Sequence, residues 1–306
     1  FFKQKTAYEI PKRDWSSDMC SSDLEIALNL IGGENNIRVG KYSIPSGLTN
    51  HDLLNMLRSG GAIVPVTVAF SEGTRIKTMA KILRRDVGID SARYVSLAFD
   101  ESFVRKYGIH STSFEGYLYP STYQLMWQSD EEEILEKQLE AMENIFTSEW
   151  KQRAKQLNLS MHDVLTLASI VEGETHIDSE RSMVACVYLN RLKKGMPLQA
   201  DPTIQYALPD GPRRLHNSDY KIESPFNTYR YYGLPPGPIN NPGKESILAV
   251  LFPKNNNNMY FVANGLGGHT FTTNYNDHLS AVKKLQRFLK ERDEEKEKLK
   301  LQSDIH

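Results

Sequence analysis

The sequence predicts an α+β protein, with small strand–helix units near its N-terminal end and a larger domain of helices and a β-hairpin after them. Two short segments, residues 37–61 and residues from 66 onward, each alternate like a strand and then place apolar residues at helical spacing. Residues 131–194 carry runs with the period of amphipathic helices. Residues 259–273 hold two strand-like runs around a glycine-rich turn, which is typical of a hairpin.

The bulk composition is that of a soluble globular protein. The 306 residues are 40% hydrophobic and 25% charged, which is enough for one large domain and a smaller one, each with a buried core. The formal net charge of -1 gives no basic excess, so we expect no nucleic-acid partner. No apolar run approaches the ~20 residues of a membrane span, and no signal peptide is recognisable. Cys20 and Cys186 lack disulfide or metal spacing, and we expect Cys186 to pack as a buried thiol.

Residues 1–24 differ from the rest of the chain. They read FFKQKTAYEIPKRDWSSDMCSSDL, with no sustained period of 2 or 3.6 and with Ser and Asp crowded near the end. The string resembles the conceptual translation of a sequencing adapter, so we expect a non-native leader that carries no information about the fold. A genuine disordered leader is the alternative. If the leader is non-native, the natural N-terminus is missing, together with any membrane anchor that it carried.

Two consecutive units, residues 25–65 and 66–108, repeat one strand–turn–helix pattern. Their turn glycines, Gly47 and Gly73, correspond, and so do the helical apolar residues that follow. We expect the first unit to be truncated at its start. The second unit, which opens VAFSEGTRIKTMAKIL, resembles the opening of a LysM module, a small glycan-binding fold.

Residues 109–290 form the expected larger domain, and residues 291–306 a charged, solvated tail. Ser160 and Asp163 suit the N-cap and N3 positions of a capping box. From about residue 195 to 243 the chain is rich in Pro, Gly, Asn and Tyr, which predicts loops and short strands, where sites often lie. The expected elements are helices over 131–157, 161–172, 180–194 and 246–251, strands over 259–263 and 269–273, and a helix from residue 276 onward.

Glu172 is the strongest candidate for acid–base chemistry. It follows the apolar run 164–171, and helical spacing stacks it over Ala168 and Leu165. Partial desolvation there favours the neutral, proton-donating form of a carboxyl group. Glu174 is a weaker version of the same case, and periodicity alone does not separate the two. The alternative is that both side chains face water at a frayed helix end.

Five segments carry a specific resemblance to a known family. They are FEGYLYPSTYQL (114–125), LTLASIVEGET (165–175), RSMVACVYLNRLKKGMPLQADPTIQYAL (181–208), SPFNTYRYYGLPPGPINNPGKESILAV (224–250) and YFVANGLGGHTFTTNYNDH (260–278). Together they are similar, in the same order, to the endolytic murein transglycosylase family, also called YceG-like, and cover nearly all of residues 38–285. The first Glu of the family's IVExET motif is catalytic and corresponds to Glu172.

The resemblance implies a lyase that cleaves the β-1,4 bond between N-acetylmuramic acid and N-acetylglucosamine in nascent peptidoglycan strands and so limits their length. One carboxyl serves both steps. Protonated Glu172 gives its proton to the glycosidic oxygen, and its carboxylate then removes the proton of the muramic acid C6 hydroxyl, which closes on C1 as a 1,6-anhydro sugar. Members of the family also carry an N-terminal membrane helix, a LysM-like region and a catalytic domain outside the cytoplasmic membrane, near peptidoglycan synthases. This chain departs from that pattern in lacking the helix.

Further candidate residues suit saccharide binding. Glu115 and Tyr117 lie in an aromatic-rich turn, where Glu115 either orients the sugar or Glu172, or holds the loop by a hydrogen bond. Two polar stretches are able to line a saccharide cleft with hydrogen bonds and rings, and their candidates are Gln199, Asp201, Thr203, Tyr206, Asn227, Thr228 and Tyr229. Loop capping is the alternative, and it is favoured for Asp201 and Thr228.

No cofactor is expected, because no nucleotide or metal motif is present. His269 has no nearby Cys or His partner, so it is expected in a strand or cleft wall rather than at a metal site. Three functions remain open: a lytic transglycosylase, an inactive peptidoglycan-binding or scaffold protein, and a hydrolytic glycosidase. A hydrolase would need a second carboxylate near Glu172, and Glu115 is the candidate for that group.

Overall fold

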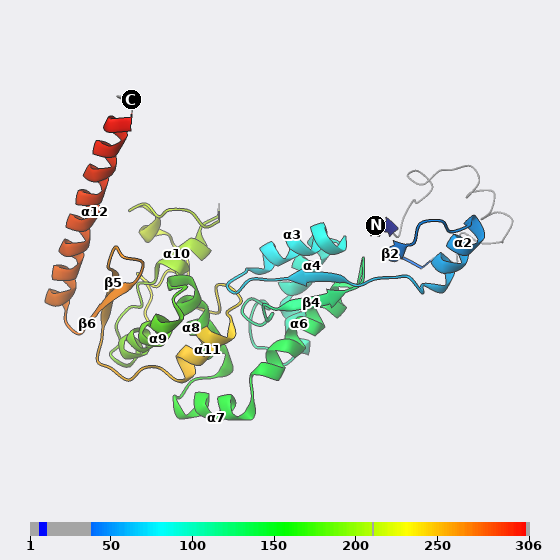
Figure 1. Ribbon diagram of the computed structural model, residues 1–306. Helices are drawn as coiled ribbons and strands as arrows, with labels where there is room; N and C mark the ends of the chain where they lie inside the picture. The colour runs from blue at the N-terminus through cyan, green and yellow to red at the C-terminus, as the bar shows by residue number, and fades with distance from the viewer. Residues whose placement is uncertain (1–5, 11–37, 210, 304–306) are drawn as a thin grey trace. The chain divides into compact units, whose positions relative to one another are not determined.

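The computed structural model describes residues 6–10, 38–209 and 211–303 (Figure 1). Helices predominate along these residues, and the named strands form three antiparallel two-stranded sheets. The expected α+β class is therefore confirmed. The chain divides into two compact units, one of residues 1–114 with 120–140 and one of residues 115–119 with 141–306.

The first unit begins with a small strand–helix element. Strand β1 (Thr6–Ile10) pairs with β2 (Gly40–Ile44), and helix α2 (Asn50–Ser59) follows. The Tyr42 hydroxyl donates a hydrogen bond to the Leu57 carbonyl at 3.1 Å, and both side chains are buried. Residues 6–10 of the expected leader thus form a strand. Its other residues, Cys20 among them, and the start of the expected unit 25–65 lie outside the described residues.

A second strand–helix element follows, as the sequence predicts. Strand β3 (Val66–Ala69) leads to α3 (Ile76–Val87), whose inner face is buried, and then to the short helices α4 (Ser91–Ala98) and α5 (Glu101–Lys106). The sequence missed strand β4 (Thr122–Leu125), which pairs with β3 and places residues 120–140 with the first unit rather than after a boundary at residue 108. The LysM-like character of residues 66–108 stays a prediction.

The single helix expected over residues 131–157 is wrong. The structure has two helices, α6 (Glu131–Ile145) and α7 (Ser148–Gln156). Thr147 separates them, because its hydroxyl accepts a hydrogen bond from the Trp150 backbone at 3.3 Å and caps the new helix. A hydroxyl side chain that bonds to nearby backbone offers an alternative to helix continuation, and apolar periodicity across the break does not reveal this.

Three helices form the core of the second unit. Helices α8 (Met161–Glu174), α9 (Asp178–Lys193) and α11 (Lys244–Leu251) pack against one another (Figure 1). The predicted capping box of Ser160 and Asp163 is present at the start of α8. Every residue of α8 from Val164 to Glu172 is buried, because the helix is covered on all sides. Cys186 is buried on α9, as expected.

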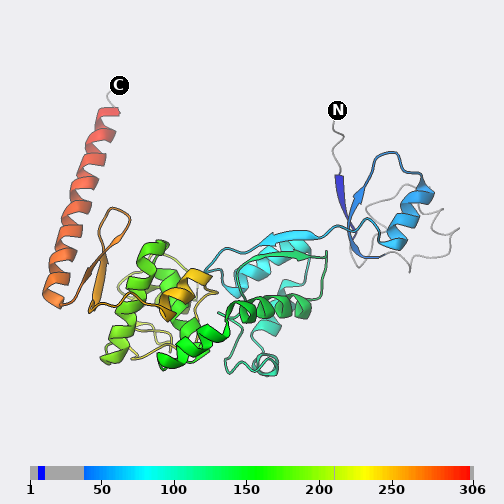
Figure 2. The ribbon, with the colours of Figure 1, turned by 60° about the horizontal axis from the view of Figure 1, so that its bottom comes forward.

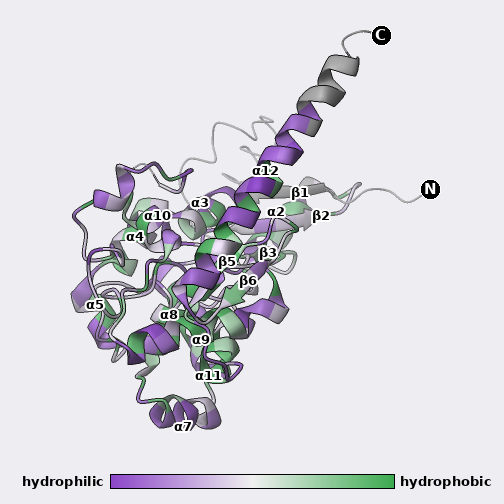
Figure 3. Ribbon diagram, turned by 90° about the vertical axis from the view of Figure 1, so that its left-hand side faces the viewer, coloured by the Kyte–Doolittle hydropathy of each residue, from purple (hydrophilic) through white to green (hydrophobic). Residues whose placement is uncertain are grey.

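The rest of the second unit surrounds this core. The predicted hairpin is confirmed as β5 (Tyr260–Ala263) and β6 (His269–Thr272). The last helix, α12 (Tyr275–Ser303), packs on the hairpin (Figure 2) and is largely hydrophilic (Figure 3). Where loops were expected, the structure has helix α10 (Asp201–Ala207) and a 3-10 turn, η2 (Asp219–Lys221). Across the described residues, none of the helices combines the length and apolar character needed to cross a membrane.

Candidate active site

Glu172 lies near the end of α8 and is 3% exposed, so the alternative of a water-facing side chain does not hold for it. Its Oε2 atom accepts a hydrogen bond from Nη1 of Arg181 at 2.8 Å, which makes a buried ion pair with the first turn of α9. The same oxygen accepts a hydrogen bond from the backbone N–H of Gly243, the N-cap of α11, at 3.1 Å. Among the residues that the structure describes, Oε1 accepts no hydrogen bond. Of the two carboxyl oxygens, Oε1 is therefore the one that these contacts leave unengaged.

These neighbours act on the charge of the Glu172 carboxyl in opposite directions. Burial disfavours the charged form, whereas the guanidinium of Arg181 stabilises it. The Gly243 amide adds to this stabilisation, because the N-terminus of a helix carries partial positive charge. The sequence argument considered burial alone and missed both partners. One oxygen of Glu172 is thus held by two donors, a guanidinium and a backbone amide.

Arg181 is itself held from three sides. It is 5% exposed, and its Nε atom donates to Oδ1 of Asp178 at 3.1 Å. Its Nη1 atom, which contacts Glu172, also donates to the hydroxyl of Ser246 on α11. The guanidinium therefore has a fixed place between α8, α9 and α11, and it fixes the carboxyl in turn.

The segment that leads to Gly243 follows α8. The Ile239 N–H donates to the Ser169 hydroxyl at 3.0 Å, and the Asn240 side-chain amide donates to the Ser169 carbonyl at 2.8 Å. Asn241 is fully buried next to them. These bonds bring the Gly243 amide to Glu172, one turn further along the same helix.

Glu115 is held by this same segment. Its Oε1 atom accepts a hydrogen bond from the side-chain amide of Asn241 at 3.0 Å, and Glu115 is 3% exposed. The carbonyl oxygen of the Asn241 side chain accepts from the backbone N–H groups of Gly116 and Leu118, at 2.8 and 3.1 Å. This geometry favours the loop-holding interpretation of Glu115, and the loop that it holds carries the amide that contacts Glu172.

Replacing Asn241 with Ala should lower the free energy of unfolding by about 2–4 kcal/mol, because it leaves two buried N–H groups and a buried carboxyl oxygen without this partner. Urea denaturation followed by circular dichroism measures the change. Asn257→Ala is the matched control, since Asn257 is exposed, and it should change the value by about 0.5 kcal/mol or less. Equal effects of the two substitutions would contradict the structural role assigned to Asn241.

Glu174 lies two positions after Glu172, so the two side chains leave α8 about 200° apart around its axis. Its Oε1 atom accepts a hydrogen bond from the Tyr188 hydroxyl of α9 at 2.6 Å. Desolvation by burial raises the pKa of Glu174 to about 7, while the Tyr188 hydrogen bond opposes the shift and the charge of Asp201 adds to it. The structure thus separates the two acids, one paired with a cation and one bonded to a phenol.

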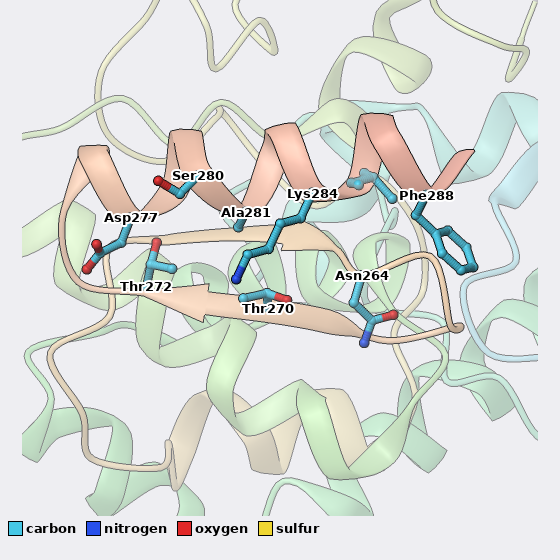
Figure 4. Close-up of a pocket in the computed structure, with 9 residues that line it drawn as sticks. Asn264, Thr270, Thr272, Asp277, Ser280, Ala281, Lys284 and Phe288 are labelled. Atoms are coloured by element: carbon cyan, nitrogen blue, oxygen red, sulfur yellow. The ribbon is translucent and has the colours of Figure 1, made fainter. Parts of the chain in front are cut away.

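Two surface hollows lie among the residues that the structure describes, and Glu172 lines neither of them. One, of about 570 Å³, lies between the hairpin and α12, with Thr270 and Lys284 on its wall (Figure 4). Thr272 also lines it, and the hydroxyl of that residue is buried without a hydrogen-bond partner. The other hollow lies on α3 and α4. A metal site is not indicated either, because the described residues contain no group of three or more His, Cys, Asp or Glu side chains that could hold an ion.

Comparison with known proteins identifies the family. The sequence model of the YceG-like family matches residues 10–284. The chain belongs to the YceG-like family. The resemblance found in the five sequence segments is therefore confirmed, and the match includes α8, Arg181 and the segment leading to Gly243.

YceG-like relatives are found among characterised sequences and solved structures. The chain is 31% identical to a protein of Bacillus subtilis (strain 168) named endolytic murein transglycosylase, over 82% of this chain and 74% of that protein. It is 29% identical to a protein of the same name from Streptococcus pneumoniae serotype 2, over 79% of this chain but only 49% of that protein. The crystal structure of a yceG-like protein from Listeria monocytogenes superposes with a TM-score of 0.67 at 27% identity, over 90% of this chain and 98% of that one.

The two predicted polar stretches of this YceG-like chain do meet in space. The Thr228 hydroxyl accepts from the Ala200 N–H at 2.9 Å and lies 3.0 Å from the Thr203 hydroxyl, and the Gln199 N–H donates to the Thr228 carbonyl. Asn227 donates from its side-chain amide to two backbone carbonyls. Thr203, Asn227 and Thr228 are buried, with polar atoms bonded to the protein, which favours the loop-capping interpretation for them.

The remaining predicted residues have other partners. Asp201 accepts a hydrogen bond from the Tyr229 hydroxyl at 2.5 Å. The ring centroids of Tyr206 and Phe226 lie 4.8 Å apart. The Tyr117 hydroxyl lies 2.7 Å from Nδ1 of His162, at the other end of α8 from Glu172. Gln199 is exposed, and its left-handed backbone, with a φ of 51°, is uncommon for a residue other than glycine. His269 lies in strand β6, where a strand position was expected for it. Its Nδ1 atom lies 2.7 Å from Oε2 of Glu180.

Sequence reasoning missed Arg181, Gly243 and Ser246, although all three lie inside the segments that carry the family resemblance. An Arg in the first turn of a helix is usually a solvated charge, and nothing in local periodicity distinguishes this one. The only available signal was the short connection between α8 and α9, residues 175–177, which brings the start of one helix back to the end of the other.

Proposed function

We propose that this chain is the catalytic part of an endolytic murein transglycosylase. It cleaves the β-1,4 bond between N-acetylmuramic acid and N-acetylglucosamine within peptidoglycan strands and leaves a 1,6-anhydro end. The observation that carries the proposal is the buried carboxyl of Glu172, which belongs to the family's IVExET motif. Arg181 and the Gly243 amide hold this carboxyl by hydrogen bonds. Relatives of this chain are named for the same activity.

In the first step the proton passes from Glu172 to the glycosidic oxygen. The bond between that oxygen and C1 of the muramic acid breaks, and the N-acetylglucosamine side leaves as an alcohol. Positive charge develops at C1, and the carboxyl becomes a carboxylate next to Arg181, which stabilises the new negative charge. Proton donation to the leaving oxygen is a general-acid contribution.

In the second step the carboxylate acts as the base. It removes the proton of the C6 hydroxyl, the C6 oxygen forms a bond to C1, and Glu172 is protonated again. No water is consumed, so the two products together have the mass of the substrate. Oε2 is occupied by Arg181 and Gly243, so Oε1 is the oxygen assigned to both proton transfers.

A hydrolytic glycosidase requires a second carboxylate to activate water or to act as a nucleophile. Glu115 was the candidate, but its carboxyl accepts a hydrogen bond from Asn241 and is buried in the loop. This arrangement favours the single-carboxyl mechanism. The inactive scaffold remains the alternative from another class of function.

Mass analysis of purified peptidoglycan strands digested with the chain separates the three functions. We expect new ends that are 1,6-anhydro sugars and fragments cut within strands rather than from their tips. Reducing ends that carry the mass of one added water would replace the transglycosylase with a hydrolase. Binding without new ends would replace it with a scaffold protein.

We further propose that the catalytic unit acts on the outer side of the cytoplasmic membrane, near peptidoglycan synthases, with a membrane helix outside this chain as its anchor. The support is the substrate, which is assembled on that side of the membrane. Protease added to intact spheroplasts should digest the full-length protein. Protection of the catalytic unit from the protease would exclude this location.

A further inference from the structure

Helix α10 packs on α8 at Gly173, the residue between Glu172 and Glu174. Gly173 has no side chain, and a Cβ atom placed there would lie 2.7 Å from Cβ of Pro202 in the first turn of α10. Real Cβ atoms do not approach other atoms this closely, so only glycine allows this contact. The position of α10 is therefore tied to the α8 backbone next to Glu172.

Acidic groups from both helices lie at this junction. Asp201 begins α10, and its carboxyl accepts hydrogen bonds from the hydroxyls of Tyr229 at 2.5 Å and Tyr220 at 3.4 Å. Glu174 lies at the end of α8, with its carboxyl bonded to the Tyr188 hydroxyl. The charges of Glu174 and Asp201 are close enough to interact, and two like charges in a partly buried place repel each other.

We propose that Glu174 is a positioning residue for the transglycosylase reaction. When Glu174 is neutral, α10 packs closely on Gly173 beside Glu172. When Glu174 is ionised, repulsion from Asp201 weakens this packing. The inference rests on the proposed function, because it concerns how Glu172 is held for that reaction. Glu174 acts through α10, not by contact with the reacting sugar. The proton transfers assigned to Glu172 are then available only while α10 stays packed on α8.

The groups that face Glu174 determine the direction of the pH effect. Tyr188 and Arg191 face it from α9, Asp201 from α10 and Tyr229 from the loop. Burial raises the pKa values of both tyrosines far above neutrality, so they stay uncharged there. Arg191 is attractive to an ionised Glu174, but its guanidinium is bonded to the carbonyls of Met259 and Leu198.

Rising pH therefore weakens the junction. With the pKa of Glu174 near 7, its carboxyl is neutral in mildly acidic solution and acquires charge as the pH passes through neutrality. The ordinary pKa of the group is 4.5, so the folded chain holds this proton more tightly than the unfolded chain does. The stabilisation is complete below about pH 4.5, declines up to about pH 7, and is absent above it.

The experiment compares the wild type with Glu174→Gln, which is neutral at every pH, and Asp201→Asn, which removes the opposing charge. Cleavage of peptidoglycan strands is measured from pH 5.5 to 8.5, and the ratio of each variant's rate to the wild-type rate is plotted. We expect the ratio for Glu174→Gln to rise about tenfold across neutrality, a change equivalent to the free energy of one modest like-charge repulsion. Asp201→Asn should show a smaller rise in the same direction, because it removes the opposing acid but leaves the larger cost of burying an ionised Glu174.

A purely structural role would lower the rate by the same factor at every pH, so flat ratios for both variants would overturn the proposal. If only one variant folds, its ratio alone decides the result.

The pH dependence of the melting temperature provides a measurement that does not need activity. The wild type should lose about 5 °C relative to Glu174→Gln between pH 5 and 8. If the wild type cleaves no strand at all, the proposed function fails, while this melting series still tests Glu174. If the melting temperatures of the wild type and Glu174→Gln changed equally with pH, the proposed repulsion between Glu174 and Asp201 would be wrong.

Discussion

Replacing Glu172 with Gln should reduce the formation of 1,6-anhydro ends by at least about 10³-fold. Gln has nearly the same shape and can still accept the hydrogen bond from Gly243, but it neither donates a proton to the glycosidic oxygen nor takes one from the C6 hydroxyl. Loss of one general acid or base step costs about 10² to 10⁴ in rate, and here one side chain performs both steps. Mass analysis of digested strands measures the loss directly.

The substitution also removes the negative charge that faces a buried cation. Arg181 still contacts the Ser246 hydroxyl and the exposed Asp178 but no longer faces the charge of Glu172, so the free energy of unfolding should fall by about 1–3 kcal/mol. Circular dichroism and a melting curve show whether the variant is folded at the assay temperature. The control is Glu149→Gln, the same change on the exposed surface of α7, which should keep activity within about twofold. A folded Glu172→Gln variant with more than a tenth of wild-type activity would move the proton transfer to another residue.

Periodicity and capping signals in the sequence predicted most of the second unit's framework. The capping box at Ser160, the buried run of α8 and the hairpin follow from local patterns, because each depends on residues close together in the chain. The break at Thr147 and the pairing of β3 with β4 were missed. The first depends on one side-chain hydrogen bond, and the second joins segments more than fifty residues apart, which no local pattern specifies.

The candidate site shows the same limit. The apolar run before Glu172 is compatible with both a buried and a water-facing side chain, whereas the family motif indicates this residue directly. Its charge environment was not predictable, because Arg181 comes from α9 and Gly243 from the segment before α11. Polar residues in loops were also ambiguous by type alone, since Thr203 and Thr228 use their hydroxyls to join two segments of the protein. Tertiary contacts decide between binding and capping roles.

Replacing Arg181 with Met should lower the free energy of unfolding by about 3–5 kcal/mol. Met fills much of the same space, but it removes the cation and leaves the buried Glu172 carboxylate to the Gly243 amide. Removing one member of a buried ion pair exposes the other to the full cost of an uncompensated charge. Cleavage should fall by at least about tenfold as well, because the carboxylate formed in the first step loses its stabilising cation. Urea denaturation and the strand assay provide the two measurements.

A double-mutant cycle separates the ion pair from simple loss of packing. With both Glu172→Gln and Arg181→Met, neither charge remains buried, so the double variant should be more stable than the sum of the single effects predicts, by about 1–3 kcal/mol. Arg230→Met is the matched control, because Arg230 pairs with the exposed Glu223 at 3.3 Å, and such surface pairs contribute little. Strictly additive effects of the two substitutions would mean that Arg181 supports the fold without sensing the charge of Glu172. In that case the carboxylate of the second step would need a different source of stabilisation, and the N-terminus of α11 is the one that the geometry offers.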